Sequence, residues 1–278
     1  MNLQLHVGCA QWTHPAWPQP SRDKLRSYAS WCNAVESNTT FYATPSRSTV
    51  ASWAAQTPPD FRFVVKLPQV ITHERRLTNV DAELRAFLTA IEPLGPRDHA
   101  VWIQLPAAFS PTDLGALAAF LHQAPRDYRY AVEVRHRAFF EEGEAAGNLE
   151  RVLARADAEW IPFDTGTLFS RRPTSFAERD AWMKKPHVAR RTRALTAHPI
   201  VRYIGRDSVD ETVAGWTYLV DLVVTWLSEG RSPTIFLHTP DNAEALNLAR
   251  RFHATVAAAV PTLPPLPEPP ETEPPTLF

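Results

Sequence analysis

Ionisable and amide side chains stand at the ends of eight short apolar runs in this chain. They are Gln11, Glu36, Lys66, Gln104, Glu133, Arg135, Asp164, Arg202 and His238. A pair of carboxylates such as Glu36 and Glu133 can divide general-acid and general-base duties when one pKa is raised. Neighbouring cations can bind a carboxylate, a phosphate or a developing oxyanion. The set therefore indicates acid–base chemistry on a polar substrate.

The runs themselves predict the elements that position these groups. They are LQLHVGCA, WCNAVESN, FRFVVKLP, HAVWIQLP, YRYAVEVRH, EWIPFDTG, PIVRYIG and TIFLHTPD, and nearly every pair is separated by enough residues for one helix. Strands that alternate with helices form βαβ units with a parallel sheet. Eight such units predict an α/β fold, a single-domain TIM-type (β/α)8 barrel over residues 1–260, whose active site lies where the strands end.

Alternation along each strand predicts which side chains face the barrel interior. In the fifth run Ala131, Glu133 and Arg135 share one face, and the apolar Val132 and Val134 share the other, which belongs against the helices. The same test predicts inward positions for Ala34, Glu36, Asn38, Lys66, Trp102, Gln104, Pro162, Asp164, Arg202, Ile204, Phe236 and His238. The lower layers are then small or apolar and the upper layer is ionisable. A purely structural ion-pair network is the alternative, because unpaired buried charges are costly.

Apolar spacing of three and four residues predicts the helices. They are expected at Ser46–Gln56, Asp81–Ile91, Asp113–Leu121, Val209–Leu227 and Asn242–Val260. The last segment, residues 261–278, holds eight of the 26 prolines and no glycine. We expect an extended or disordered, solvated tail there.

A basic segment lies between the sixth and seventh runs. Arg171 to Arg193 carries eight Lys or Arg and two acids, a net charge of +6, whereas the other residues carry 21 basic and 28 acidic side chains, a net charge of −7. Such an asymmetry fits either a solvated charged helix or a rim that attracts phosphate or another polyanion, nucleic acid included.

The composition of the whole chain fits one barrel. The chain has 278 residues, 44% hydrophobic and 21% charged, with a formal net charge of −1. That charge gives no general reason to expect nucleic-acid or membrane binding. The N-terminus lacks the pattern of a signal peptide, no apolar run is long enough to span a bilayer, and only two cysteines are present. We therefore expect a cytoplasmic protein; the sequence does not indicate its oligomeric state.

Metal and cofactor motifs are sparse. His73, His136, His238, Glu36, Glu133, Asp164 and Asp241 are acceptable ligands, but no HxH or HExxH spacing is present. We assign no residue to a metal and keep a divalent metal as an alternative. Neither GxGxxG nor GxxxxGK[ST] occurs, and no GxSxG nucleophile elbow is found.

Several motifs in register resemble the YecE-like family, defined by a domain of unknown function 72. They are GCAQWTHP, VESNTTFYATP, DFRFVVKLPQVITHE, WIQLPAAF, YAVEVRHRAFF and FLHTPD, within residues 7–250. The resemblance implies a TIM-type barrel but brings no established reaction. Many members have GTSGW-like and FNN-like motifs where this chain has GCAQW and HTPD, as in the YecE subgroup. It also implies pocket residues at Gln11, Trp12, Glu36, Asn38, Tyr42, Lys66, His73, Gln104, Glu133, Arg135, His136, Asp164, Arg202, His238 and Asp241.

We therefore expect an enzyme, a hydrolase, lyase or isomerase, that acts on a small polar substrate with phosphate or carboxylate groups. The expected acid and base are Glu36 and Glu133, with Asp164 and His238 orienting. The other pocket residues bind substrate, among them three cations and an aromatic wall of Trp12, Phe41 and Tyr42. One alternative is a metal-dependent phosphodiesterase or nuclease-like barrel that holds nucleic acid through the basic segment. The other is a non-catalytic ligand-binding barrel.

Overall fold

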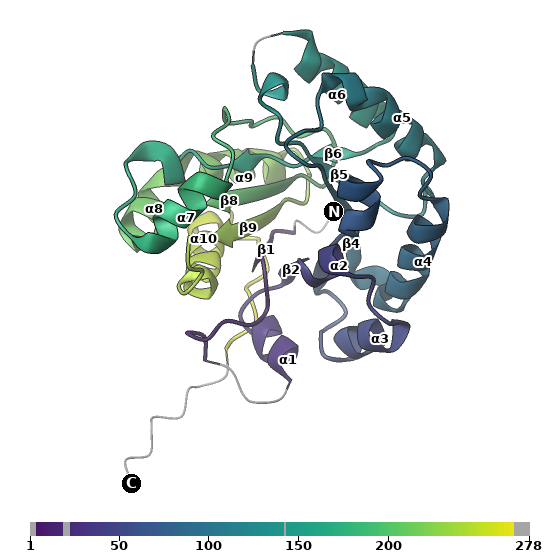
Figure 1. The fold of residues 1–278 in the computed structure, drawn as a ribbon. Coiled ribbons are helices and arrows are strands. Elements are labelled where there is room, and N and C mark those ends of the chain that lie inside the picture. The colour runs from purple at the N-terminus through teal and green to yellow at the C-terminus, as the bar shows by residue number, and fades with distance from the viewer. Residues whose placement is uncertain (1–3, 19–22, 142, 270–278) are drawn as a thin grey trace.

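The structure is a computed structural model that describes residues 4–18, 23–141 and 143–269, and its parallel strands lie inside a ring of helices (Figure 1). Within those residues, nine strands form one sheet in the order β6-β5-β4-β3-β2-β1-β9-β8-β7. The strands are β1 His6–Cys9, β2 Ala34–Ser37, β3 Arg62–Lys66, β4 Asp98–Gln104, β5 Tyr130–Glu133, β6 Glu159–Trp160, β7 Phe163–Asp164, β8 Ile200–Ile204 and β9 Thr234–His238. All eight predicted runs therefore contain strand.

The sixth run is divided into two strands, and this division closes the ring. β6 pairs with β5, and β7 pairs with β8. Between them, the Ile161 N–H donates to the Val132 carbonyl at 2.8 Å, and the Arg202 N–H donates to the Pro162 carbonyl at 3.1 Å. Because Pro162 has no N–H, the ladder is interrupted there while the backbone runs on from one neighbour to the other. The predicted TIM-type barrel is confirmed.

Helices cover the outside of the strands. They are α1 Lys24–Ala29, α2 Thr39–Tyr42, α3 Arg47–Ala55, α4 Asp81–Ile91, α5 Leu114–Gln123, α6 Glu144–Arg155, α7 Phe176–Lys184, α8 Val209–Gly215, α9 Thr217–Ser228 and α10 Ala245–Ala259. Short 3-10 or π turns occupy Val70–Glu74, Glu92–Arg97, Pro111–Asp113, Arg137–Phe139 and Leu168–Ser170.

The predicted helices are found with bounds that differ by up to three residues, and one of them is divided into two. α4 has the predicted bounds, and α3 begins one residue after Ser46, whose side chain caps it by accepting from the Thr49 N–H. The single helix expected over Val209–Leu227 is two helices that meet at Trp216. The break buries the Trp216 ring between Tyr203 and Phe252. Gly215 is needed there, since a Cβ would lie 2.1 Å from Thr167 Oγ1.

Two of the three apolar clusters found in the described residues form most of the barrel core. The larger one joins the outer strand faces to the helices and includes Val35, Val65, Val132, Phe87, Leu117 and Phe252. The smaller one fills the barrel interior with Ala34, Val64, Ala100, Trp102, Ala131, Ile161, Ile200 and Phe236. This interior set confirms the predicted inward faces of the second, fourth, fifth and last runs. The prediction for the sixth run is wrong, because Ile161 rather than Pro162 faces inward.

A second polar layer lies below the apolar interior, where we expected small or apolar residues. His6 and His99 are buried, with ring centroids 5.1 Å apart, and the His198 ring lies 5.8 Å from that of His99. The Nδ1 atom of each of the three rings is buried and has no hydrogen-bond partner among the described residues. The apolar layer therefore lies between two polar ends.

The first part of the proline-rich segment is in contact with the barrel. Residues 261–269 contain no helix or strand, but Leu263 and Leu266 are buried in the larger apolar cluster. Arg250 Nη1 donates to the Pro267 carbonyl at 2.7 Å. The expectation of a solvated tail is thus wrong for this part, and residues 270–278 lie outside the described residues. Among the described residues, no helix has the length and apolar character needed to cross a membrane.

The histidine layer predicts how stability depends on pH. Burial and neighbouring charges lower the pKa of His6 to about 3 and that of His99 well below its usual range. The unfolded chain takes up these protons near pH 6.5, so the stabilisation is complete above that pH and is lost as the pH falls. Between pH 7 and pH 5 the parent should lose about 2 kcal/mol more unfolding free energy than His99→Gln. Urea unfolding at both pH values measures this; equal losses would contradict it.

Candidate functional site

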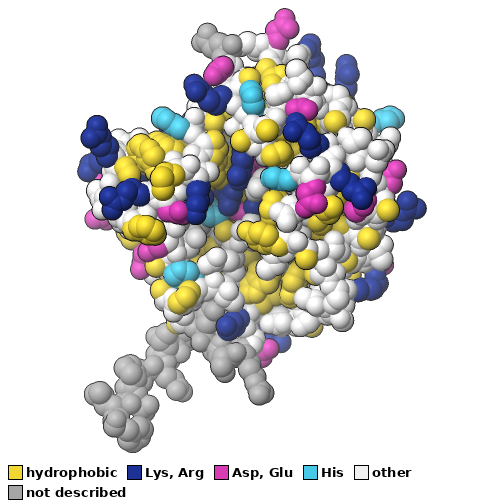
Figure 2. Space-filling model, in the orientation of Figure 1, with side chains coloured by type: hydrophobic (Ala, Val, Ile, Leu, Met, Phe, Trp, Pro, Cys, Tyr) yellow, Lys and Arg dark blue, Asp and Glu magenta, His cyan; other side chains and the backbone are white. Residues whose placement is uncertain are grey.

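A cavity of about 580 Å³ lies at the mouth of the barrel, over the carboxyl ends of the strands. Lys and Arg side chains gather around a hollow near the centre of the face shown in Figure 2. The lining residues come from strands, from α2, from loops that follow strands and from the end of α7: Ala10, Gln11, Trp12, Thr13, Asn38, Thr39, Phe41, Tyr42, Lys66, Gln104, Arg135, Phe163, Lys184, Lys185 and Arg202. This is the end at which the sequence predicts the site.

Glu36 is the most heavily paired group below the cavity, and its side chain is 0% exposed. Lys66 Nζ lies 2.7 Å from Glu36 Oε1, and Arg202 Nε lies 3.2 Å from Oε2. His238 Nε2 is 3.0 Å from the same Oε2. These partners belong to β3, β8 and β9, so the carboxylate ties three strand ends to β2.

Glu133 forms the second centre of the same network. Arg135 Nε donates to its Oε1 at 2.7 Å, and Arg202 Nη1 lies 3.7 Å from its Oε2. Arg202 therefore lies between the two carboxylates, which come from β2 and β5. Both carboxylates are fully buried, while Lys66, Arg135 and Arg202 line the cavity. The cations thus separate the carboxylates from the cavity.

The protonation states differ from the expected division into acid and base. Burial alone would raise the pKa of Glu36, but Arg202 and Lys66 outweigh it and hold the value well below its usual range. Arg135 and Arg202 likewise outweigh burial and lower the pKa of Glu133. Neither carboxyl group therefore has the raised pKa of a general acid. Burial and Arg202 lower the pKa of His238 to about 4, so its ring is neutral at pH 7.

Lys66 is the group beside these carboxylates that can exchange a proton near neutral pH. Burial lowers its pKa to about 8, although Glu36 acts in the opposite direction. Its Nζ also donates to Gln104 Oε1 at 3.0 Å and lies 4.6 Å from the centroid of the Trp102 ring. The Trp102 ring is buried in the apolar interior of the barrel, directly below the polar layer.

Phe163 supplies an aromatic wall that the sequence did not predict. The guanidinium carbons of Arg202 and Arg135 lie 5.0 and 5.2 Å from its ring centroid, and Lys185 Nζ lies 5.6 Å away. Cations over an aromatic face are attracted by the ring quadrupole. Because the strand is interrupted at Pro162, Phe163 occupies the inward position that alternation had given to Asp164.

Asp164 instead faces the helix layer, so its predicted inward position is wrong. One oxygen accepts from the Gly166 N–H at 2.8 Å, and the other accepts from the Tyr218 hydroxyl of α9. Arg190 Nε lies 3.4 Å from the carboxylate. These contacts fix the loop after β7, and the structure does not bring Asp164 to the cavity.

The basic segment reaches the cavity through Lys184 and Lys185 at the end of α7. Lys184 pairs with Asp180 at 2.7 Å. The Lys185 amine makes no hydrogen bond or ion pair with the residues that the structure describes, and burial, Arg202 and Arg135 lower its pKa to about 8. With Lys184 neutralised by Asp180, the site has four cations, Lys66, Arg135, Lys185 and Arg202, against two carboxylates.

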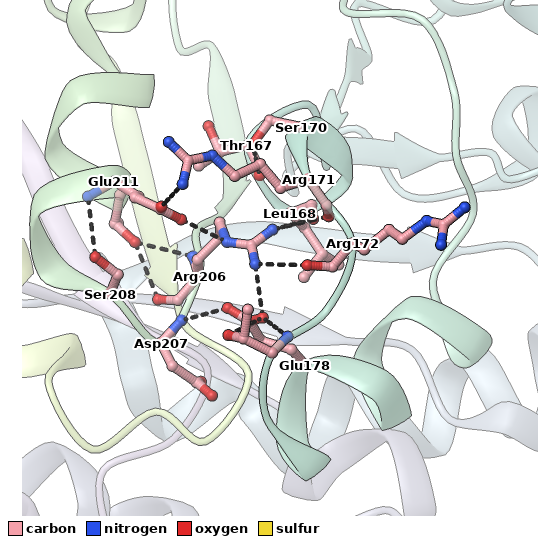
Figure 3. A network of polar contacts seen from close by, with 12 residues as sticks. Thr167, Leu168, Ser170, Arg171, Arg172, Glu178, Arg206, Asp207, Ser208 and Glu211 are labelled. Atoms are coloured by element: carbon pink, nitrogen blue, oxygen red, sulfur yellow. Dashed lines mark hydrogen bonds and ion pairs between the residues drawn. The ribbon is translucent and has the colours of Figure 1, made fainter.

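A buried arginine holds this segment in place (Figure 3). Arg206 Nη2 lies 2.7 Å from Glu178 Oε2 and also donates to the Arg172 carbonyl, while Nη1 donates to the carbonyls of Leu168 and Arg171. Its Nε lies 2.7 Å from Glu211 Oε2. A single guanidinium thus fixes the loop before α7 and, through Glu178, α7 itself.

Four of the six arginines of the basic segment are also paired, and within the segment only Phe176–Lys184 is helical. Arg171 pairs with Glu211, Arg190 with Asp164, and both Arg191 and Arg193 pair with Glu150. Much of its excess positive charge is therefore compensated by the barrel. Helix therefore covers only part of the segment, and its attraction for a polyanion stays a prediction.

The other predicted pocket residues fall into two groups. Gln11, Trp12, Asn38, Tyr42 and Gln104 line the cavity. His73 lies in the π turn beside it, with its ring 5.0 Å from that of the lining residue Phe41. π turns are frequent at functional sites.

Two predicted pocket residues, His136 and Asp241, have local roles instead. His136 Nδ1 accepts from the Ala138 N–H at 3.3 Å, and Asp241 Oδ1 accepts from the Ala243 N–H at 3.0 Å. Both cap turns, and neither lines the cavity. In the described part of the chain, no three His, Cys, Asp or Glu side chains are placed to hold a metal ion.

Comparisons with known proteins agree with the resemblance seen in the motifs. The family model for a protein of unknown function, DUF72, matches residues 6–273. The chain is 36% identical over 259 residues to UPF0759 protein YecE of Escherichia coli strain K12, covering 93% of this chain and 95% of that protein.

Solved structures show the same fold. A DUF72 family protein of Enterococcus faecalis V583 has a TM-score of 0.69 and 18% identity, covering 93% of this chain and 98% of its own. Another, from Thermotoga maritima MSB8, has a TM-score of 0.67 and 22% identity, covering 91% of this chain and 99% of its own.

The ion-pair network predicts a large effect of Glu36→Gln. This change leaves Lys66 and Arg202 without their shared carboxylate, so the unfolding free energy should fall by about 3 kcal/mol. Adding Lys66→Met should cost less than the sum of the two single changes. Glu92→Gln, which removes the exposed pair with Arg47, is the control and should have little effect. Urea unfolding measures the parent and the four variants, Lys66→Met alone included; a Glu36→Gln loss as small as that of Glu92→Gln contradicts the network.

Proposed function

The chain belongs to the DUF72 family, and we propose that it is a cytoplasmic barrel enzyme that acts on a small anionic substrate at the mouth of the barrel. The observation that carries this proposal is the imbalance of charge there. Lys66, Arg135, Lys185 and Arg202 stand against Glu36 and Glu133. A ligand with about two negative charges would make the site neutral.

The arrangement favours phosphate or carboxylate groups as the anion. Arg135 and Arg202 present planar guanidinium groups, which form paired hydrogen bonds with such oxygens. Amides of Gln11 and Asn38 line the same cavity. An aromatic side formed by Trp12, Phe41 and Phe163 would cover the apolar part of the substrate. A volume of about 580 Å³ suits a small molecule.

Proton transfer in this proposal is performed by lysine amines. Lys66 lines the cavity with a pKa of about 8, so its Nζ can give up a proton and regain it near neutral pH. Glu36 and Glu133 hold these cations by ion pairs below the cavity, and both carboxylates act to raise the pKa of Lys66. This division suits lyase, isomerase or hydrolase chemistry in which a proton is moved on or off the substrate.

Anion binding is tested with inorganic phosphate, glycerol 3-phosphate and malonate, with glycerol as the neutral comparison. The anions should raise the Tm, and added sodium chloride should weaken the effect. Arg135→Gln should weaken binding about tenfold in calorimetric titration, since a charge-assisted hydrogen bond contributes about 1.5 kcal/mol or more. Arg47→Gln on α3 is the control. Stabilisation by glycerol equal to that by the anions contradicts an anion site.

Turnover is tested with a metabolite extract incubated with the parent protein or with Lys66→Met, followed by mass spectrometry. An anionic metabolite should disappear with the parent and persist with the variant, because the variant lacks the amine that exchanges the proton. Binding of anions without consumption of any metabolite would indicate the non-catalytic, ligand-binding barrel instead.

A further inference from the structure

Lys185 differs from the neighbouring lysines in what its amine contacts. Lys66 is held by Glu36 and Gln104, and Lys184 is held by Asp180. Within the described residues, Lys185 has no such partner, and its Nζ lies 5.6 Å from the Phe163 ring centroid in the cavity wall. A partly buried amine without a carboxylate is costly for a purely structural residue.

The surroundings of Lys185 increase the share of its amine that is neutral and nucleophilic. Burial and the positive charges of Arg202 and Arg135 bring its pKa to about 8. In about one tenth of the molecules the Lys185 amine is then unprotonated at pH 7. Desolvation and neighbouring cations are the two conditions that activate lysine as a nucleophile towards carbonyl compounds.

The backbone around Lys185 is fixed. Its N–H donates to the Ala181 carbonyl at 2.9 Å, and the next carbonyl, that of Pro186, accepts from Thr165 Oγ1 at 2.9 Å. Pro186 favours extended backbone at Lys185, and the observed ψ is 140°. Together with the Arg206 contacts, these bonds fix the backbone from which the Lys185 side chain extends to the cavity.

We propose that Lys185 forms an imine with a carbonyl group of the small anionic substrate. This inference rests on the proposed function, because the cations of the same cavity would hold the anionic part of that substrate. The amine nitrogen attacks the carbonyl carbon, and a C–N bond forms as the carbonyl oxygen takes up a proton. Loss of the second N–H proton and of the oxygen as water gives the imine. Its protonated form accepts the electron pair of an adjacent C–H bond while a base of the cavity takes the proton, which gives an enamine. Return of a proton to the enamine carbon restores the protonated imine, and water then releases the product carbonyl compound and the amine.

The test uses pyridoxal 5′-phosphate, an anionic aldehyde, as the probe. The full chain is incubated with it, and sodium borohydride then reduces any imine to a stable secondary amine by hydride addition. Peptide mass spectrometry should find Lys185 labelled at least tenfold faster than its neighbour Lys184, and phosphate should protect it. Lys185→Arg keeps the charge and should abolish this label, whereas Lys24→Arg on α1 should leave it unchanged.

The outcomes separate this inference from the proposed function. Equal labelling of Lys184 and Lys185, or preferential labelling of Lys66, overturns the role of Lys185. If the probe competes with phosphate but no label appears on Lys185, the imine is excluded while the anion site is retained. If neither phosphate nor the probe binds, both proposals fail. Binding of phosphate by Lys185→Arg shows that this variant is folded.

Discussion

The burial of two carboxylates at the strand ends is the constraint on which this structure depends. Glu36 and Glu133 are completely withdrawn from water, and an isolated buried carboxylate would be neutralised or would destabilise the fold. Arg202 reaches both of them, and Lys66 and Arg135 complete the pairing. The cations of the cavity wall are therefore in place before a ligand binds. The barrel supplies the strands, but this pairing decides which groups face the ligand.

Most of the barrel and part of the site could be predicted from strand alternation. The run containing Glu133 has an apolar face and a polar face, so its direction is determined by burial alone. The predicted side-chain directions of the sixth run are wrong because alternation assumes an unbroken strand. At Pro162 the ladder changes partner, and Phe163 rather than Asp164 faces inward. A proline in a central strand was the available signal.

The remaining site residues depend on contacts that sequence patterns do not encode. Lys185 belonged to a segment recognised for its charge, but its place in the cavity depends on Arg206, which follows a different strand. His136 and Asp241 carry suitable side chains, yet each is used by a turn of its own backbone. The histidines at the opposite end were not predicted because each stands alone in the sequence, and only the closed barrel brings them together.

The same kind of interaction, a buried arginine between two glutamates, is used twice with different consequences. Arg202 joins Glu36 to Glu133 and still lines the cavity, so its charge is shared between the fold and a ligand. Arg206 joins Glu178 to Glu211 away from the cavity and is 1% exposed, so its charge serves only the fold. The second arrangement fixes the segment that ends in Lys185. Lys185 brings a positive charge to the cavity and no carboxylate with it. The excess of cations at the mouth of the barrel therefore depends on the ion pair of Arg206 with Glu178, which lies away from the cavity.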